Sequence, residues 1–355
     1  MESKETVEIN FSPPTPNFFI DPSYPDYYGD RLFDVSDAAF NRDDSLVPFS
    51  TLRDALRCRG VQLHTADFLL RQNRSGELNY YYSLGMQGYR QLHDLSNVVL
   101  RAFAIMEPPI IAKHLYAKLP ELTSRFDAVY VHNCDGDGYS LKGVDRSKLR
   151  RLDWPLPYNN VNEPYWSAPG REPKIVVING HHRPGFRRGE LYSERIRAVV
   201  ALARLGAVDL FGAGWNKLFG RQSVSLAYLR NRGTLLRVYR GSCQSKSQVL
   251  SRYDFSLCIE NQAMNGYISE KIFDCIYAGA IPIYIGAKDV LQYIPGDAFV
   301  DGRAFGDWTE MWTFLRSMSR QQRERIREAG RAFLSGAGGQ RFYNSLQRMF
   351  GIIDN

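Results

Sequence analysis

The sequence has few cysteines and no segment that could cross a membrane. Its five cysteines are far apart and none forms a CxxC pair, which argues against a disulfide framework. No uninterrupted apolar run approaches the roughly 20 residues of a membrane-spanning helix, and the charged start MESKETVEINF has no apolar signal core. Internal repeats and low-complexity tracts are also absent. We therefore expect a soluble, cytoplasmic protein, at most peripheral to the inner face of a membrane.

The composition is that of a globular protein with anionic partners. Hydrophobic residues make up 44% and charged residues 23% of the 355 residues, a length suited to two domains of ordinary size. The net charge of +7 favours nucleotides, nucleic acid or an acidic membrane face as partners. Because this charge is spread along the chain, with one basic cluster at 316–331, a dedicated nucleic-acid arm is not expected.

Strand and helix patterns alternate in two parts of the chain, which predicts two α/β domains that are doubly wound and face a central cleft. We place the first domain at 1–165, where the opening segment, rich in Pro, Asp, Tyr and Phe, is expected to wrap a surface rather than form long elements. The Pro-rich stretch 151–173 is expected to link the domains, and the second domain spans 166–335. After a break at AGG, residues 336–355 are expected to form a helix that packs back on the first domain.

Five predicted strand ends are candidate ligand positions, because open α/β sheets bind ligands at the carboxyl ends of their strands. These ends follow Ile105, Ile178, Phe211, Ile259 and Ile285. A helix is predicted to start after Ser269, and Lys271 in its first turn opposes the helix dipole. A bound anion would account for this misfit. The alternative is that Glu270 and Lys271 are ordinary solvated residues.

The segment 253–301 resembles the signature of glycosyltransferase family 10, the α-1,3/4-fucosyltransferases. The residues that carry the likeness are Ile259-Glu260-Asn261, Tyr267-Ile268-Ser269-Glu270-Lys271 and IPIYIG, in the order of the family pattern. The likeness extends upstream through SERIRAVVALARLGAVDLFGAG and YRGSCQSKSQVLSRYDF, and more weakly to AFAIMEPPII and RFDAVYVHN. It implies a soluble bacterial-type member with a GT-B fold of two Rossmann-like domains and the donor site in the second.

The resemblance implies an inverting transfer of fucose from GDP-fucose to a hydroxyl of a glycan acceptor, with no bound cofactor and no required divalent metal. It implies Glu107 as the catalytic base, although an exposed loop carboxylate is the alternative. The implied donor-binding residues are Arg195, Arg197, Lys246, Asn261, Tyr267, Glu270 and Lys271. A plain core position is the alternative for Tyr267, and an exposed helix charge for either arginine.

Three other features of the sequence have alternative interpretations. Asp135 and Asp137 in HNCDGDGYS could hold a divalent metal in a GT-A-like glycosyltransferase that uses another nucleotide sugar. His181 and His182 in NGHHRPG diverge too much for a metal pair and fit a loop near the donor better. The basic segment 316–331 is either a solvated face or a contact with an acidic membrane that carries lipid-linked or lipopolysaccharide acceptors.

Two further functional classes do not involve the transfer of a sugar. A nucleic-acid-binding protein would use the positive charge and the many tyrosines, but it would not explain the ordered segment around Lys271. A catalytically inactive binder of nucleotide sugars would keep that segment and lose the role of Glu107. We therefore expect a nucleotide sugar and an oligosaccharide or lipid-linked glycan as partners, and no nucleic acid.

Overall fold

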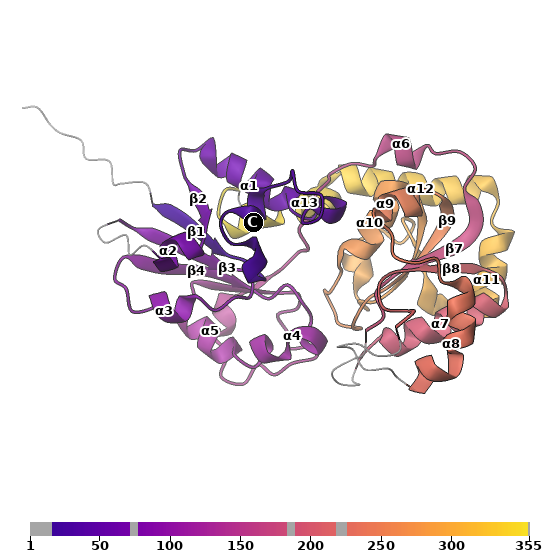
Figure 1. The fold of residues 1–355 in the computed structure, drawn as a ribbon, viewed down its shortest axis with the longest axis horizontal. Coiled ribbons are helices and arrows are strands. Elements are labelled where there is room, and N and C mark those ends of the chain that lie inside the picture. Colours follow the sequence, from indigo (N-terminus) through magenta and orange to yellow (C-terminus); the bar gives the residue numbers. More distant parts are fainter. Residues whose placement is uncertain (1–15, 72–76, 183–188, 218–225, 354–355) are drawn as a thin grey trace, which may run out of the picture.

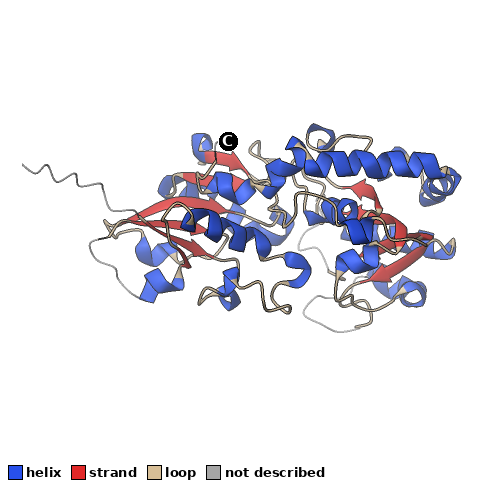
Figure 2. Ribbon diagram, turned by 90° about the horizontal axis from the view of Figure 1, so that it is seen from above, coloured by secondary structure: helices blue, strands red, loops and turns tan. Residues whose placement is uncertain are grey.

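Two all-parallel β-sheets form the cores of two domains that lie side by side (Figure 1). The computed structural model describes residues 16–71, 77–182, 189–217 and 226–353, so the charged start and part of NGHHRPG, 183–185, lie outside the described residues. The first sheet has the strand order β2-β1-β3-β4-β5-β6 and the second the order β11-β10-β9-β7-β8. Helices cover the sheets (Figure 2). The predicted class, a GT-B pair of Rossmann-like domains, is confirmed.

The elements of the first domain have the following bounds. The strands are β1 (Asn17–Asp21), β2 (Leu63–Thr65), β3 (Asn79–Ser83), β4 (Val98–Ala104), β5 (Ala128–Val131) and β6 (Leu149–Arg151). The helices are α1 (Val47–Arg57), α2 (Asp67–Arg71), α3 (Tyr89–Leu92), α4 (Pro109–Tyr116) and α5 (Leu119–Arg125).

The second domain repeats the alternation of strand and helix. Its strands are β7 (Glu172–Ile178), β8 (Val208–Phe211), β9 (Tyr253–Ile259), β10 (Ile281–Ile285) and β11 (Val300–Asp301). The helices from the linker onward are α6 (Glu163–Trp166), α7 (Tyr192–Arg204), α8 (Leu226–Val238), α9 (Lys246–Leu250), α10 (Glu270–Ala278), α11 (Trp308–Ser317), α12 (Arg320–Ser335), α13 (Ala337–Tyr343) and α14 (Ser345–Met349).

The opening segment has no long element, as predicted, but it contributes a short strand to the sheet. Residues 17–21 form β1, which pairs in parallel with both β2 and β3 and is buried over four of its five residues. The run NFFID is short but apolar, as a strand covered on both faces requires. The turn residues on either side of it, such as Pro16 and Pro22, are what made the segment look irregular.

The C-terminal segment crosses back to the first domain, but its break differs from the predicted one. The glycines of AGG lie in the first turn of α13, and the chain is interrupted instead at Gly336 and Asn344. Past α14, the ring of Phe350 stacks on Tyr82 of β3 at 3.7 Å between centroids. The predicted domain boundaries themselves stay a prediction.

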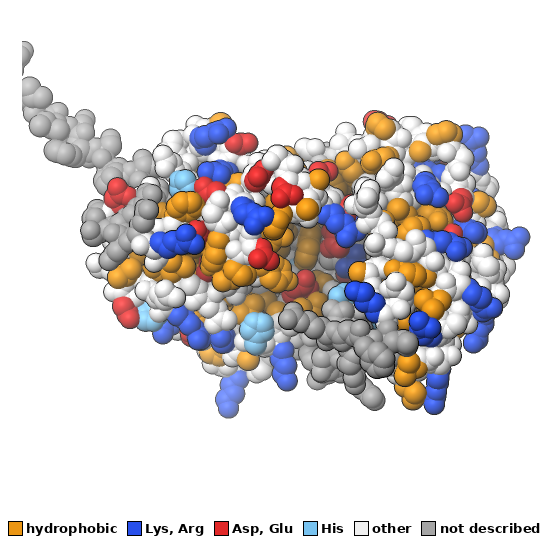
Figure 3. All heavy atoms as spheres, viewed as in Figure 1, with side chains coloured by type: hydrophobic (Ala, Val, Ile, Leu, Met, Phe, Trp, Pro, Cys, Tyr) orange, Lys and Arg blue, Asp and Glu red, His pale blue; other side chains and the backbone are white. Residues whose placement is uncertain are grey.

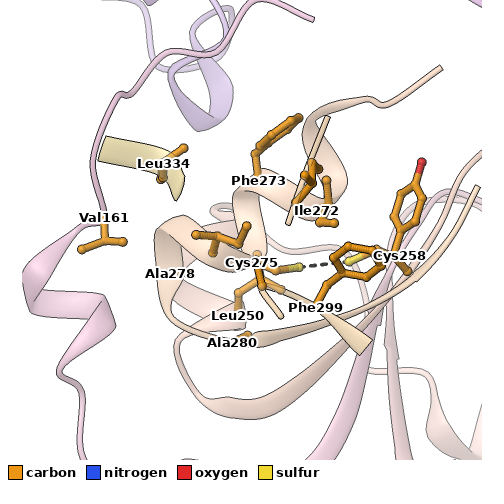
Figure 4. Packing of buried hydrophobic residues seen from close by; sticks show 14 of the residues in the cluster. Val161, Leu250, Cys258, Ile272, Phe273, Cys275, Ala278, Ala280, Phe299 and Leu334 are labelled. Atoms are coloured by element: carbon orange, nitrogen blue, oxygen red, sulfur yellow. Dashed lines mark hydrogen bonds between the residues drawn. The ribbon is translucent and has the colours of Figure 1, made fainter. Parts of the chain in front are cut away.

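Helix α10 is anchored by a buried apolar face. Ile272, Phe273, Cys275 and Ile276 are all buried against the second sheet and its neighbours, and Figure 4 shows this packing, with Cys275 beside Cys258 of β9. The amphipathic spacing of these residues explains why the segment is a helix. Its first turn is thereby fixed at the end of β9, where the predicted anion site lies.

The glycine that ends α10 gives a test of this packing. Gly279 has a φ of 77°, and a Cβ there would lie 2.8 Å from Arg171 Nη2 and 2.9 Å from Trp166 Cα. Gly206 has a φ of 66° but open space around it. We expect Gly279→Ala to lower the free energy of unfolding by about 2–5 kcal/mol and Gly206→Ala by about 1–2 kcal/mol. Urea unfolding measures both, and equal losses would contradict the crowding at Gly279.

Candidate functional site

A cleft of about 670 Å³ lies between the two domains, and Figure 3 shows the molecule hollowed there. Four of the five predicted strand ends contribute to it, those after Ile105, Ile178, Phe211 and Ile259. The residues that these ends place in the cleft are Glu107, Asn179, Gly180, Gly212, Ala213 and Asn261. Residues that follow Ile285 are not among the lining residues that the structure describes. The parallel sheets thus bring side chains far apart in sequence to one place.

Hydrogen bonds join the two domains beside the cleft, which Ile110 lines. The backbone N–H of Ile110 donates to Gln262 Oε1 at 3.0 Å, and the N–H of Asn265 donates to Asp137 Oδ2 at 2.8 Å. The His132 and Tyr267 rings meet edge to face across the same junction, with centroids 4.9 Å apart. These contacts set the position of Glu107, in the loop before α4, relative to the second domain.

Arg195 of α7 is a buried cation with unused donors. Its Nη2 donates to the carbonyl of Ile259 at 2.8 Å, and lies 3.4 Å from both the Glu260 carbonyl and Asn261 Oδ1. Its Nε is buried and has no hydrogen-bond partner among the described residues. Burial lowers the pKa of Arg195, while Tyr192 and Glu260 oppose that effect. A guanidinium held in this way at the wall of the cleft is suited to an anionic ligand.

Lys271 is fixed by a carboxylate behind it. Its Nζ lies 3.0 Å from Glu260 Oε2 and 2.7 Å from Ser269 Oγ, and Glu260 is fully buried. Burial alone would lower the pKa of Lys271, but Glu260 and Glu270 outweigh it and raise the pKa. An ammonium group has three N–H donors. Two of them are used here and Glu270 Oε1 lies 3.9 Å away; no third hydrogen-bond partner is found among the described residues, so one donor can serve a ligand in the cleft.

Ser269 is the N-cap residue of α10, as predicted, but its side chain does not cap the helix. Its hydroxyl and its backbone N–H both bond to the Glu260 carboxylate, at 2.8 Å for the closer hydroxyl contact and 2.8 Å for the N–H. The Ser269 side chain therefore satisfies none of the first N–H groups of α10, which have no partner within the helix. A bound anion could accept hydrogen bonds from these N–H groups and from the Lys271 ammonium.

Glu270 and Lys246 form a second charged pair at the cleft wall. Lys246 Nζ lies 3.4 Å from Glu270 Oε1 and 3.1 Å from Asp274 Oδ2. Burial would raise the pKa of Glu270, but Lys271 and Lys246 outweigh it and lower the pKa to about 2. Glu270 is therefore ionised at neutral pH and can only accept hydrogen bonds, as a partner for hydroxyl groups would.

Glu107 is the carboxylate of the first domain that faces these groups. Its Oε2 is buried without a hydrogen-bond partner among the described residues. Burial raises its pKa to about 7; Lys271 opposes this shift, whereas Glu270 and Glu260 add to it. A carboxylate with a pKa near neutrality and an unused oxygen is chemically suited to accept a proton.

Two predicted donor residues do not line the cleft. Arg197 is exposed and pairs with Glu194 on the outer face of α7, so the prediction that it contacts the donor is not supported by its position. Tyr267 is fully buried beneath the cleft, where its hydroxyl lies 3.4 Å from Asn261 Nδ2. The alternative stated for it, a core position, describes what the structure shows. The other predicted residues, Glu107 included, share the one cleft.

The metal readings have no geometric support in the described residues. Asp135 is exposed and 3.5 Å from Arg146, and Asp137 bonds to the second domain rather than facing the cleft. Nowhere among the described residues do three or more His, Cys, Asp or Glu side chains gather in a way that could hold a metal ion. His182 lines the cleft near its predicted loop position, whereas His181 is buried against Trp215.

Two residues were missed as part of the site. Glu260 was noted only as part of a motif, yet it holds Lys271 and Ser269 together. Asp274, which shares Lys246 with Glu270, is four residues beyond Glu270 on the same helix face. That spacing was a usable signal, because residues four apart on a helix are neighbours.

The basic segment of α12 is mostly engaged with its own domain. Arg323 bonds to Asp254, Arg327 to the carbonyl of Gly279, and Arg331 lies over the Trp166 ring. Over the part of the chain that the structure describes, no helix has both the length and the apolarity to cross a bilayer.

The second domain is similar to a known protein family. Residues 188–327 match the family model "Glycosyltransferase family 10 (fucosyltransferase) C-term". An alpha-(1,4)-fucosyltransferase of Arabidopsis thaliana is 36% identical over 69 residues, 19% of this chain and 17% of that protein. A GDP-fucose protein O-fucosyltransferase 3 of Xenopus tropicalis is 31% identical over 136 residues, 37% of this chain and 26% of that protein. The alignments thus span about a quarter or less of those relatives.

A solved structure extends the likeness to the whole fold. An alpha1,3-fucosyltransferase superposes with a TM-score of 0.50 at 17% identity, and the superposition covers 93% of this chain and 85% of that one. At this identity the likeness is one of fold. The family resemblance predicted from the segment 253–301 is confirmed by the family model, whose matched range 188–327 contains the whole segment.

Proposed function

Because residues 188–327 form a glycosyltransferase family 10 domain, we propose that this protein transfers fucose from GDP-fucose to a hydroxyl of a glycan acceptor, with inversion at the transferred carbon. The observation that carries the proposal is the placement of Glu107. Its carboxylate, whose Oε2 has no hydrogen-bond partner in the described part of the chain, belongs to the first domain and lines the same cleft as Arg195, Lys246 and Lys271 of the second. A base and a set of leaving-group cations on opposite domains are what an inverting transfer needs.

In the proposed reaction the acceptor hydroxyl gives its proton to the Glu107 carboxylate. The acceptor oxygen forms a bond to the anomeric carbon while the bond from that carbon to the diphosphate oxygen breaks. GDP leaves with the electron pair of that bond, so its negative charge grows. Lys271, Arg195 and the first N–H groups of α10 stabilise this charge, and the cleft holds both reactants in place.

The cations of the cleft also support the proposal that a divalent metal is not required. Lys271 and Arg195 are held in place by the buried Glu260 and by backbone carbonyls before any ligand binds. Their charge is therefore preorganised at the proposed diphosphate position. In metal-dependent enzymes a divalent cation stabilises the negative charge of the phosphoryl groups in the same way. Glu270, ionised at neutral pH, is proposed to accept hydrogen bonds from hydroxyls of the donor.

The proposed donor follows the printed name of one relative, a GDP-fucose protein O-fucosyltransferase 3. The proposed acceptor is an oligosaccharide or a lipid-linked glycan. Arg320 and Arg325 of α12 are exposed, and we propose that they provide peripheral contact with an acidic membrane surface that carries such an acceptor.

A donor panel tests the proposed function. The panel consists of GDP, GDP-fucose, GDP-mannose, UDP and UDP-glucose, each titrated by calorimetry. We expect the guanine nucleotides to bind, and GDP-fucose to bind most tightly of the sugar nucleotides. Transfer or slow hydrolysis of bound GDP-fucose is expected in the same preparation. Tight binding of UDP without binding of GDP would contradict the assignment.

The raised pKa of Glu107 predicts a pH dependence. Below a pKa of about 7 the carboxyl is protonated and cannot accept the acceptor's proton. We therefore expect kcat/KM for transfer to rise about tenfold per pH unit below this pKa and to level off above it. Initial rates measured between pH 5 and pH 9 give this pH dependence of kcat/KM. A midpoint near 4.5, the ordinary value for Glu, would contradict a buried base.

A further inference from the structure

A second cavity, of about 480 Å³, shares helix α4 with the cleft. Ile110 and Ile111 of α4 line the cleft, whereas Lys113 and Tyr116 line the second cavity. The loop after β5, which includes Tyr139, and the start of α5 at Pro120 also line it. Because α4 begins two residues after Glu107, the second cavity adjoins the position proposed for the acceptor hydroxyl.

The floor of this cavity is aromatic and holds an unused hydroxyl. The rings of Tyr116 and Tyr139 lie 4.7 Å apart between centroids. Tyr116 is only 4% exposed, and its Oη has no hydrogen-bond partner among the described residues. A buried hydroxyl without a partner costs free energy, so a ligand hydroxyl that bonds to it would be favoured. The faces of sugar rings pack well on such an aromatic surface.

The rim of the cavity is positively charged. Lys113 and Lys142 are exposed at its edge, and neither has an ion-pair partner among the described residues. The carboxylates of the adjoining loop are engaged elsewhere, Asp135 with Arg146 and Asp137 with the N–H of Asn265. Figure 3 shows Lys and Arg side chains projecting from the edge of the first domain where Figure 1 places α4 and α5.

We propose that this cavity is an acceptor subsite for a sugar ring that carries an anionic substituent, either a carboxylate or a sulfate or phosphate ester. The ring packs on Tyr116 and Tyr139, a ring hydroxyl bonds to Tyr116 Oη, and the anionic group lies between Lys113 and Lys142. The proposal rests on the proposed function, because it takes the cleft beside Glu107 as the site of transfer. It makes the first domain the part that selects charged over neutral acceptors.

Saturation-transfer NMR and calorimetry with three probes test this subsite. The probes are lactose, 3′-sialyllactose and 3′-sulfolactose, which share a neutral disaccharide and differ in the added anionic group. We expect at least one charged probe to bind the wild type about three- to tenfold more tightly than lactose at low salt. A preference for 3′-sialyllactose would identify a carboxylated sugar as the ligand, and a preference for 3′-sulfolactose an ester.

Variants assign the effect to the cavity. The double substitution Lys113→Gln/Lys142→Gln is expected to abolish the preference for the charged probes, while Lys288→Gln, an exposed lysine of the second domain, keeps it. Tyr116→Phe is expected to weaken all three probes several-fold. Equal binding of charged and neutral probes, no binding of any probe, or a preference that survives the double substitution would overturn the proposal. GDP titrated into the same proteins separates the outcomes, since absent GDP binding would refute the proposed donor function alone.

Discussion

Replacing Glu107 with Gln is expected to lower the rate of sugar transfer by about 10²–10⁴-fold, the usual contribution of a general base. The amide has nearly the same shape as the carboxylate but cannot accept the acceptor's proton. The side chain is partly buried and its buried Oε2 has no partner among the described residues, so the substitution breaks no hydrogen bond at that atom. Steady-state transfer from GDP-fucose, followed by release of GDP, measures the loss.

A matched substitution separates chemistry from charge. Glu328→Gln removes a carboxylate that is 53% exposed on α12, far in sequence from the cleft residues. It is expected to leave the transfer rate within about twofold of wild type, because exposed ion pairs contribute little. Comparable losses in both variants would contradict a specific role for Glu107.

Replacing Lys271 with Met is expected to lower transfer by about 10²–10³-fold, since one preorganised group that stabilises leaving-group charge is removed. The methionine side chain keeps most of the apolar length of lysine and lacks the ammonium. Donor affinity is expected to fall as well, because the diphosphate is charged before the reaction begins. Calorimetry with GDP and kinetics with GDP-fucose measure the two losses. Lys288→Met, an exposed lysine of the same domain, is expected to cause neither.

Lys271→Met is also expected to lower the stability of the fold, and this effect has to be measured separately from the loss of transfer. Lys271 pairs with the fully buried Glu260, and removing one partner of a buried pair costs about 3–5 kcal/mol. The double variant Glu260→Gln/Lys271→Met leaves no uncompensated buried charge. We expect it to unfold at a higher urea concentration than Lys271→Met and yet to remain as slow in transfer. Recovery of transfer in the double variant would show that the loss came from folding.

The strand ends were predictable from sequence because their signals are local. An apolar run followed by polar residues marks a strand end, and parallel sheets collect such ends at one edge. This reasoning placed Glu107 and Asn261 beside Lys271 in one cleft. It missed β1, because a strand of five residues between prolines has too little pattern to outweigh its turn-forming neighbours.

Side-chain direction was harder to predict than element position. Arg195 and Arg197 are two residues apart on α7, so they point to different faces of the helix and only one could reach the cleft; helical geometry was a signal that could have separated them. The burial of Tyr267 depends on His132 of the first domain, a contact between distant segments that no local pattern contains. The contact between Glu260 and Lys271 is likewise not visible in the sequence pattern, so Glu260 was noted only as part of a motif.

The proposed base and the proposed donor site lie on different domains, and we propose that they act separately. Calorimetric titration of GDP-fucose into Glu107→Gln tests this claim. We expect a dissociation constant within about threefold of wild type, a difference below roughly 0.7 kcal/mol, in a variant that has lost transfer. A donor affinity that falls together with the transfer rate would place Glu107 in the donor site and contradict the claim.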